Sequence, residues 1–223
     1  MTPITADQLS QHAFHTLRTD IIAGKLAPEM RLRIAVLKDL YGIGTSPLRE
    51  ALSRLVADGL VIDLERRGFM VAPISIQDFQ DLTNTRKFLE KEALRQSILH
   101  GNDDWEGRII SSFHQLTKAQ GRLDKAAPET VMEWETLNKA FHETLISACP
   151  SKWLLRFRDM VYSYTERYRR ICLTTVDVSR NVQNEHKALL DAVLARDFER
   201  SATLNDEHLE NTFQKVMKSG KLT

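Results

Sequence analysis

The chain has 223 residues, 42% of them hydrophobic, which is enough to build a packed core in one large domain or two modest ones. Its 31 lysines and arginines are balanced by 30 aspartates and glutamates, and the net charge of +1 excludes a protein that is basic over its whole surface. No segment approaches the roughly 20 apolar residues of a membrane-spanning helix or the apolar stretch of a secretory signal, so we expect a cytoplasmic protein with no membrane partner.

Three helices are predicted in the first part of the chain. The first covers residues 6–23, where apolar side chains recur at helical spacing. The second covers the run IAVLKDLYG, whose last residue, Gly42, is typical of a helix C-terminus. The third begins at Thr45 or Ser46, whose hydroxyls can cap the first amide groups, and it ends at Gly59.

The pattern after the third helix changes from helical to extended. The runs LVIDL and GFMVAP favour β-strands, and the segment ERRG between them supplies the glycine of a tight hairpin turn. Three helices followed by a hairpin are the order of a winged helix-turn-helix domain. We place the end of this domain near Pro73.

The third helix carries the residues expected to contact DNA. The second helix of a helix-turn-helix motif, which is the third predicted helix of this chain, enters the major groove. Arg49 on its first turn can bond a guanine through two parallel hydrogen bonds. Any single arginine is explained equally well by a solvated helix face, and a winged helix can also serve protein contacts alone. The candidate DNA-binding residues are Arg31, Arg33, Thr45, Ser46, Arg49, Arg54, Arg66, Arg67 and Gly68.

The rest of the chain has no strand pattern and is predicted to be all helical. About six helices are expected, over residues 75–101, 103–123, 128–149, 151–173, 178–196 and 198–219. The fold class is therefore mainly α, with a winged helix-turn-helix domain over residues 1–73 and a helical bundle over residues 74–223.

Three histidines stand on separate predicted helices of this bundle, each within an apolar stripe. They are His142, His186 and His208, and Asn138 lies one turn before the first of them on the same helix face. Imidazoles from three helices that meet inside a bundle suit a divalent transition metal. A hydrogen-bonded core or surface position explains each histidine separately, because spacing along the chain does not place the three together.

Two stretches of the sequence resemble a known family. SPLREALSRLVADGLV and RRGFMVAP resemble the recognition helix and the wing of the GntR family of bacterial transcription regulators, over roughly residues 10–73. The chain departs from the family where Thr45 replaces an arginine, and where Ala35 and Val36 replace an acidic and a basic residue. These changes imply a different base preference.

The segments AFHETL, EHKALLDAVLARD and the later EH resemble the metal-binding motifs of the FadR C-terminal (FCD) type of GntR effector domain. The resemblance implies a zinc or nickel ion held by His142, His186 and His208, with Asn138 in place of the family's aspartate. An amide oxygen is a neutral and weaker donor than a carboxylate.

The resemblance also implies a small carboxylic acid as effector. In TRKFLEKEAL, Arg86 matches the arginine that faces the effector cavity in the family, and Arg167 and Arg169 are further candidates, although a solvated face explains these two equally well. Within the family the chain most resembles carbon-starvation-induced regulators, which implies a 2-hydroxy or dicarboxylic acid.

The function predicted is a homodimeric DNA-binding transcription regulator, usually a repressor in this family, on a near-palindromic operator. One alternative is a metal-dependent hydrolytic enzyme built on the histidines, which we disfavour because Glu143, Glu185 and Glu207 follow or precede a histidine directly and so turn to other helix faces. Another is a regulator that responds to the metal alone.

Overall fold

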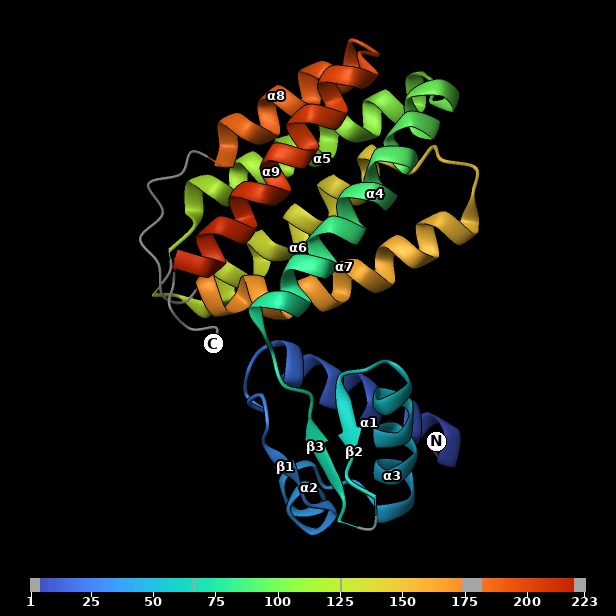
Figure 1. The fold of residues 1–223 in the computed structure, drawn as a ribbon, viewed down its shortest axis with the longest axis vertical. Coiled ribbons are helices and arrows are strands. Elements are labelled where there is room, and N and C mark those ends of the chain that lie inside the picture. Colours follow the sequence, from blue (N-terminus) through green and yellow to red (C-terminus); the bar gives the residue numbers. More distant parts are fainter. Residues whose placement is uncertain (1–4, 66, 125, 174–181, 219–223) are drawn as a thin grey trace. The chain divides into compact units, whose positions relative to one another are not determined.

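The computed structural model describes residues 5–65, 67–124, 126–173 and 182–218 (Figure 1). Its contacts divide the chain into two compact units, Met1–Ser75 with Glu166–Arg170, and Ile76–Thr165 with Ile171–Thr223. Among the described helices, none combines the length and the apolar character that crossing a membrane requires. The mainly α fold class predicted from the sequence is confirmed.

The first unit contains the three predicted helices, α1 (Ala6–Ile22), α2 (Ile34–Tyr41) and α3 (Thr45–Ala57). A capping box starts α1, since the side chain of Thr5 accepts from the amide of Gln8 and the side chain of Gln8 accepts from the amide of Thr5. Helices α1 and α3 pack against each other through fully buried apolar side chains. These are Ala13, Leu17, Leu48, Ala51, Leu52 and Leu55.

The start of α3 differs from the prediction. Gly44, not Thr45 or Ser46, is the N-cap residue, and no side chain caps the helix. Both hydroxyl residues already lie within the first turn, and both are exposed. Their side chains are therefore available to a partner of the helix rather than used to begin it.

The sheet of the first unit has three antiparallel strands in the order β1-β3-β2. The predicted hairpin is present as β2 (Val61–Asp63) and β3 (Phe69–Val71), and Gly68 adopts a positive φ of 92° in the turn between them. The third strand, β1 (Arg31–Leu32), lies in a stretch with no strand pattern of its own. Pairing with β3 defines it, and this pairing is a tertiary contact.

The second unit is helical throughout its described part, as predicted. Helix α5 packs against α6, and α9 packs against both α4 and α8, around a shared apolar core that includes Trp105, Phe141 and Leu189. The segment 178–181, expected to begin the fifth helix of this unit, lies outside the described residues. The helices are α4 (Ile76–His100), α5 (Asp103–Arg122), α6 (Pro128–Leu145), α7 (Lys152–Leu173), α8 (Val182–Leu194) and α9 (Phe198–Lys218).

A candidate DNA-binding groove and a candidate metal centre

A groove of about 300 Å³ lies on the first unit between β1, the start of α2, α3 and the hairpin. Four exposed arginines line it, Arg31, Arg33, Arg49 and Arg67, together with one acidic residue, Asp63. Four guanidinium groups against one carboxylate make this part of the surface positive. A positive groove beside an exposed helix is suited to the phosphates of a duplex.

The other predicted DNA-binding residues lie around this groove or outside it. Gly68 lines the groove, and Thr45 and Ser46 are exposed on the first turn of α3. Arg54 is exposed but its guanidinium lies 4.3 Å from the centre of the Phe14 ring, which is a cation–π contact within the unit. Arg66 lies outside the described residues.

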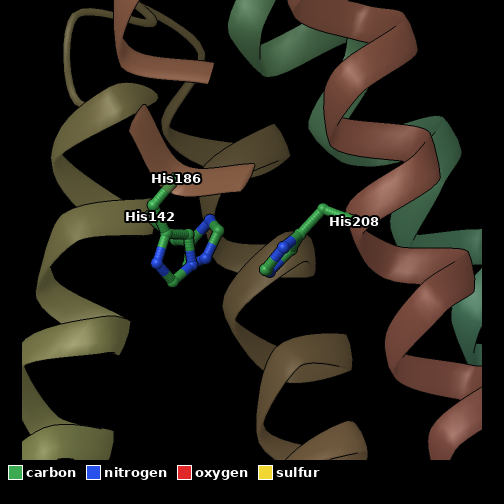
Figure 2. A group of neighbouring side chains, drawn as sticks. All are labelled: His142, His186 and His208. Atoms are coloured by element: carbon green, nitrogen blue, oxygen red, sulfur yellow. The ribbon is translucent and has the colours of Figure 1, made fainter. Parts of the chain in front are cut away.

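Three histidines meet inside the second unit, and each comes from a different helix (Figure 2). His142 of α6, His186 of α8 and His208 of α9 are buried, and their ring centres lie 4.9–5.2 Å apart. One nitrogen from each ring lies within 4.8 Å of the others. This separation allows one cation to contact all three imidazoles.

Two buried polar atoms near these rings have no hydrogen-bond partner in the described part of the structure. They are Oδ1 of Asn138 and Nε2 of His142, which stand one turn apart on α6. Buried polar atoms are nearly always satisfied, so an oxygen and a ring nitrogen without partners on one helix, one turn apart, require an explanation. Both are ordinary metal ligands, and the residues present fit a bound cation.

The electrostatic setting keeps His142 neutral. Burial lowers the pKa of its ring well below 6.5, and the neighbouring rings of His208 and His186 and the charges of Arg86 and Arg158 lower it further. Only a neutral imidazole has the lone pair that binds a metal.

Glu185 does not turn away from the histidines as the sequence led us to expect. Its Oε2 lies 2.8 Å from Nδ1 of His208, and its Oε1 accepts from the side-chain amide of Asn211. The expectation considered only the helix that carries Glu185, whereas the contact crosses from α8 to α9. An ionised carboxylate only accepts hydrogen bonds, so this contact favours the tautomer of a neutral His208 that carries its proton on Nδ1 and its lone pair on Nε2. Glu143 instead pairs with Lys139 near the surface, and Glu207 is exposed.

Two buried arginines share one buried carboxylate close to the histidines. Nε of Arg86 and Nε of Arg158 donate to the same oxygen of Glu90, at 2.8 and 2.9 Å, and Asn205 donates to its other oxygen. Both guanidinium groups lie 4.5 Å from the centre of the Tyr162 ring. Burial acts to raise the pKa of Glu90, but the two arginines and Asn205 outweigh it and lower the pKa to about 2.

Arg158 and Glu90 were missed in the sequence. A signal for Arg158 exists, because its position continues the buried side of α7 that includes Val161, Tyr162 and Thr165. An arginine on an apolar helix face is rarely fully buried without a specific partner.

Arg167 and Arg169, the other expected effector residues, are also buried, but their segment of α7 groups with the first unit. Within that unit Nη2 of Arg167 donates to the backbone carbonyl of Ala72 at 2.7 Å. Arg86 and Arg158 belong to the same unit as the three histidines and lower the pKa of His142, and they are therefore the better candidates.

Comparisons with known proteins identify the family of both parts of the chain. Residues 9–71 match the model of the family described as bacterial regulatory proteins, gntR family, and residues 81–211 match that of the FCD domain. The HTH-type transcriptional regulator BphR of Paraburkholderia xenovorans is 44% identical over 96% of this chain and 87% of its own length. The HTH-type transcriptional repressor GlaR of Escherichia coli is 34% identical over 90% of this chain and 92% of its own.

The fold is also that of solved regulators. The structure of E. coli McbR/YncC superposes with a TM-score of 0.79 at 18% identity, over 96% of this chain and 99% of that one. A GntR-family regulator from Pseudomonas syringae pv. tomato is 28% identical, with a TM-score of 0.56, over 96% and 86% of the two chains. The chain therefore belongs to the GntR family, with an FCD domain after its winged helix-turn-helix domain, and it is a DNA-binding transcription regulator rather than an enzyme.

Proposed function

We propose that this regulator is a homodimeric repressor that binds a near-palindromic operator. A small carboxylic acid, bound at a zinc or nickel ion, controls its affinity for that operator. The observation that carries the proposal is the meeting of three buried histidines, one of which follows Asn138 by one helical turn, and the buried oxygen of Asn138 has no hydrogen-bond partner among the described residues. Two relatives are named as repressors, GlaR and RspR of E. coli, and they support repression rather than activation.

The metal would be held by imidazole nitrogens of His142, His186 and His208 and by the amide oxygen of Asn138. A cation in this position supplies a positive charge that attracts a carboxylate. Because Nδ1 of His208 faces Glu185, the nitrogen that His208 offers is Nε2.

The charges around the histidines favour an anionic effector. Arg86 and Arg158 are two buried positive charges in the same unit as the histidines, and both pair with the single carboxylate of Glu90. Oδ1 of Asp159 lies 3.2 Å from Nη1 of Arg158, but the side chain of Asp159 is 58% exposed, so water screens its charge. Nη2 of Arg158 is buried with no hydrogen-bond partner among the described residues, and a carboxylate oxygen is the acceptor that suits it.

The acid can regulate DNA binding only if it binds the DNA-competent and incompetent states with different affinity. We therefore propose to select an operator from random duplexes with the metal-loaded protein and then to titrate small carboxylic acids into the complex. Release by an acid that depends on the metal supports the proposal. Release by chelation alone, with no response to any acid, would instead support a regulator that responds only to the metal.

Arg49→Ala is expected to weaken binding to the selected operator by about 1–3 kcal/mol, which is roughly 5- to 150-fold, because the substitution removes a guanidinium from the exposed face of α3. Fluorescence anisotropy at a fixed salt concentration measures the change. Arg200→Ala removes the same charge from an exposed position on α9 and serves as the control. Equal affinities of the two variants would contradict the assignment of α3 as the recognition helix.

Asn138→Asp is expected to raise the affinity for zinc about tenfold or more, equivalent to about 1.4 kcal/mol, because a carboxylate replaces a neutral oxygen at the candidate ligand position. Competition with a chromophoric chelator measures the affinity. Asn184→Asp adds the same charge at an exposed position of α8 and should change it little. An unchanged or lower affinity of Asn138→Asp would place Asn138 outside the ligand set.

A further inference from the structure

Helix α8 supplies two neighbouring side chains to the group of histidines. His186 is one of the three buried rings that meet inside the second unit (Figure 2), and Glu185, the residue before it, contacts His208 on α9. Successive residues of a helix project about 100° apart, so a single turn of α8 can supply a ring to the group and a carboxylate to its edge. Helix α8 therefore contributes one histidine and also contacts a second histidine on another helix.

Both oxygens of the Glu185 carboxylate contact α9. Oε2 lies 2.8 Å from Nδ1 of His208, and Oε1 accepts from Nδ2 of Asn211 at 3.2 Å. His208 and Asn211 are three residues apart on α9, so they lie on the same face of that helix. Two contacts between one carboxylate and one helix face fix the direction from which Oε2 approaches the ring.

The contact between Glu185 and His208 is largely shielded from water. The side chain of His208 is 10% exposed and that of Glu185 is 23% exposed. A pair that is mostly removed from water is screened less than a pair on the surface, and its side chains have less freedom to separate. The contact can therefore hold the ring of His208 in one orientation.

The identity of the contacted nitrogen has a consequence for metal binding. A neutral imidazole carries a proton on one nitrogen and a lone pair on the other, and a metal binds the nitrogen with the lone pair. In the tautomer that the contact favours, Nε2 of His208 has the lone pair. In the other tautomer, the proton would block Nε2 and the lone pair of Nδ1 would face a carboxylate oxygen.

We propose that Glu185 is a positioning residue of the metal centre, which orients the ring of His208 and favours the tautomer whose Nε2 can bind the cation. Glu185 acts through His208 and is not itself a ligand. The inference rests on the proposed function for the presence of a metal. Where a carboxylate accepts from the outer nitrogen of a ligating histidine, its removal typically lowers metal affinity 10- to 100-fold.

Two substitutions of Glu185 separate the charge of its side chain from its shape. Glu185→Ala is expected to raise the dissociation constant for zinc about 10- to 100-fold, measured by competition with a chromophoric chelator. Glu185→Gln keeps an oxygen that can accept from Nδ1 of His208, so it should recover part of this loss. A glutamine variant as weak as the alanine variant would overturn the orientation of the ring as the cause.

Glu207→Ala is the matched control. Glu207 directly precedes His208, as Glu185 precedes His186, but the side chain of Glu207 is exposed. The substitution removes the same charge next to the same histidine in sequence, and it should leave the zinc dissociation constant within about threefold of the wild type. Equal losses in Glu185→Ala and Glu207→Ala would overturn a specific role for Glu185.

The tautomer of His208 can be measured in the chelated protein, without any metal. Long-range ¹H–¹⁵N spectra at about pH 9, where an imidazole is neutral, distinguish the ring nitrogen with the proton from the one with the lone pair. We expect the proton on Nδ1 in the wild type and a shift towards Nε2 in Glu185→Ala. A contact that only ties α8 to α9 would lower the melting temperature of Glu185→Ala and leave the tautomer unchanged, which would overturn the proposal.

The zinc titration of the wild type distinguishes this inference from the proposed function. A wild-type chain that binds no zinc overturns the metal centre and the role of Glu185 together. A wild-type chain that binds zinc, with the same affinity as Glu185→Ala, overturns the role of Glu185 alone.

Discussion

Replacing His142 with alanine is expected to raise the dissociation constant for zinc by about 100-fold or more. The substitution removes one of three imidazoles that lie close enough to share a cation, and loss of even an outer-shell partner typically costs 10- to 100-fold. The remaining rings of His186 and His208 would hold the metal with two nitrogens. Competition titration against a chelator of known affinity measures the change.

His114→Ala is the matched control for this prediction, because His114 is exposed on α5 and lies outside the group of three. The thermal unfolding of both variants should also be measured after chelation, since His142 is buried and its removal leaves a cavity. Zinc affinity that survives His142→Ala, or that falls equally in His114→Ala, would show that the metal does not bind at these histidines.

Replacing Glu90 with glutamine is expected to lower the free energy of unfolding by about 3–5 kcal/mol. The substitution keeps the shape of the side chain but removes the negative charge that two buried guanidinium groups, those of Arg86 and Arg158, share. For a chain of this size, a loss of this magnitude corresponds to a fall of roughly 6–20 °C in the melting temperature. Differential scanning calorimetry of the chelated protein measures it.

The control is Asp191→Asn, which removes one partner of an exposed ion pair with Lys187 and should change stability by less than about 1 kcal/mol. A melting temperature of Glu90→Gln equal to that of this control would show that the ion pairs of Glu90 with Arg86 and Arg158 contribute no net stability.

The effect of Glu90 should also depend on pH. The pKa of Glu90 is lowered to about 2 in the folded chain from an ordinary value of 4.5, so the unfolded chain binds a proton first as the pH falls. The contribution of the charged group is complete above about pH 4.5 and is lost towards about pH 2. The difference in stability between wild type and Glu90→Gln should therefore shrink over this interval, and a constant difference would contradict a role for the charge.

Local patterns in the sequence were sufficient for the secondary structure of most of the chain. The predictions depended on short stretches of sequence: the apolar spacing of α1, the glycine at position 42 and the β-favouring runs on either side of the hairpin turn. The corresponding elements are confirmed. The start of α3 was wrong by one residue, because Gly44 takes the cap position and leaves the hydroxyls of Thr45 and Ser46 exposed.

The residues of the candidate sites were also predicted from the sequence only in part. The histidine positions could be read from the sequence because each stands within the apolar stripe of its own helix, and so could Arg86 by family resemblance. Spacing along the chain did not show that His142, His186 and His208 meet, which only the family resemblance implied, and nothing in the sequence indicated the contact of Glu185 with His208. Arg158 was missed because a charged residue on a buried helix face makes sense only beside a partner such as Glu90.

The amino-acid sequence by itself determined which face of each helix is apolar, which segments form the helices and the wing, and which family the chain resembles. Only the tertiary structure decided that β1 pairs with β3, that the three imidazoles converge, and that Arg86 and Arg158 share Glu90. The physical reason is the separation along the chain over which each kind of interaction acts. Helical spacing and turn residues act over a few positions along the chain, whereas the meeting of α4, α6, α7, α8 and α9 depends on side-chain packing between segments far apart in sequence.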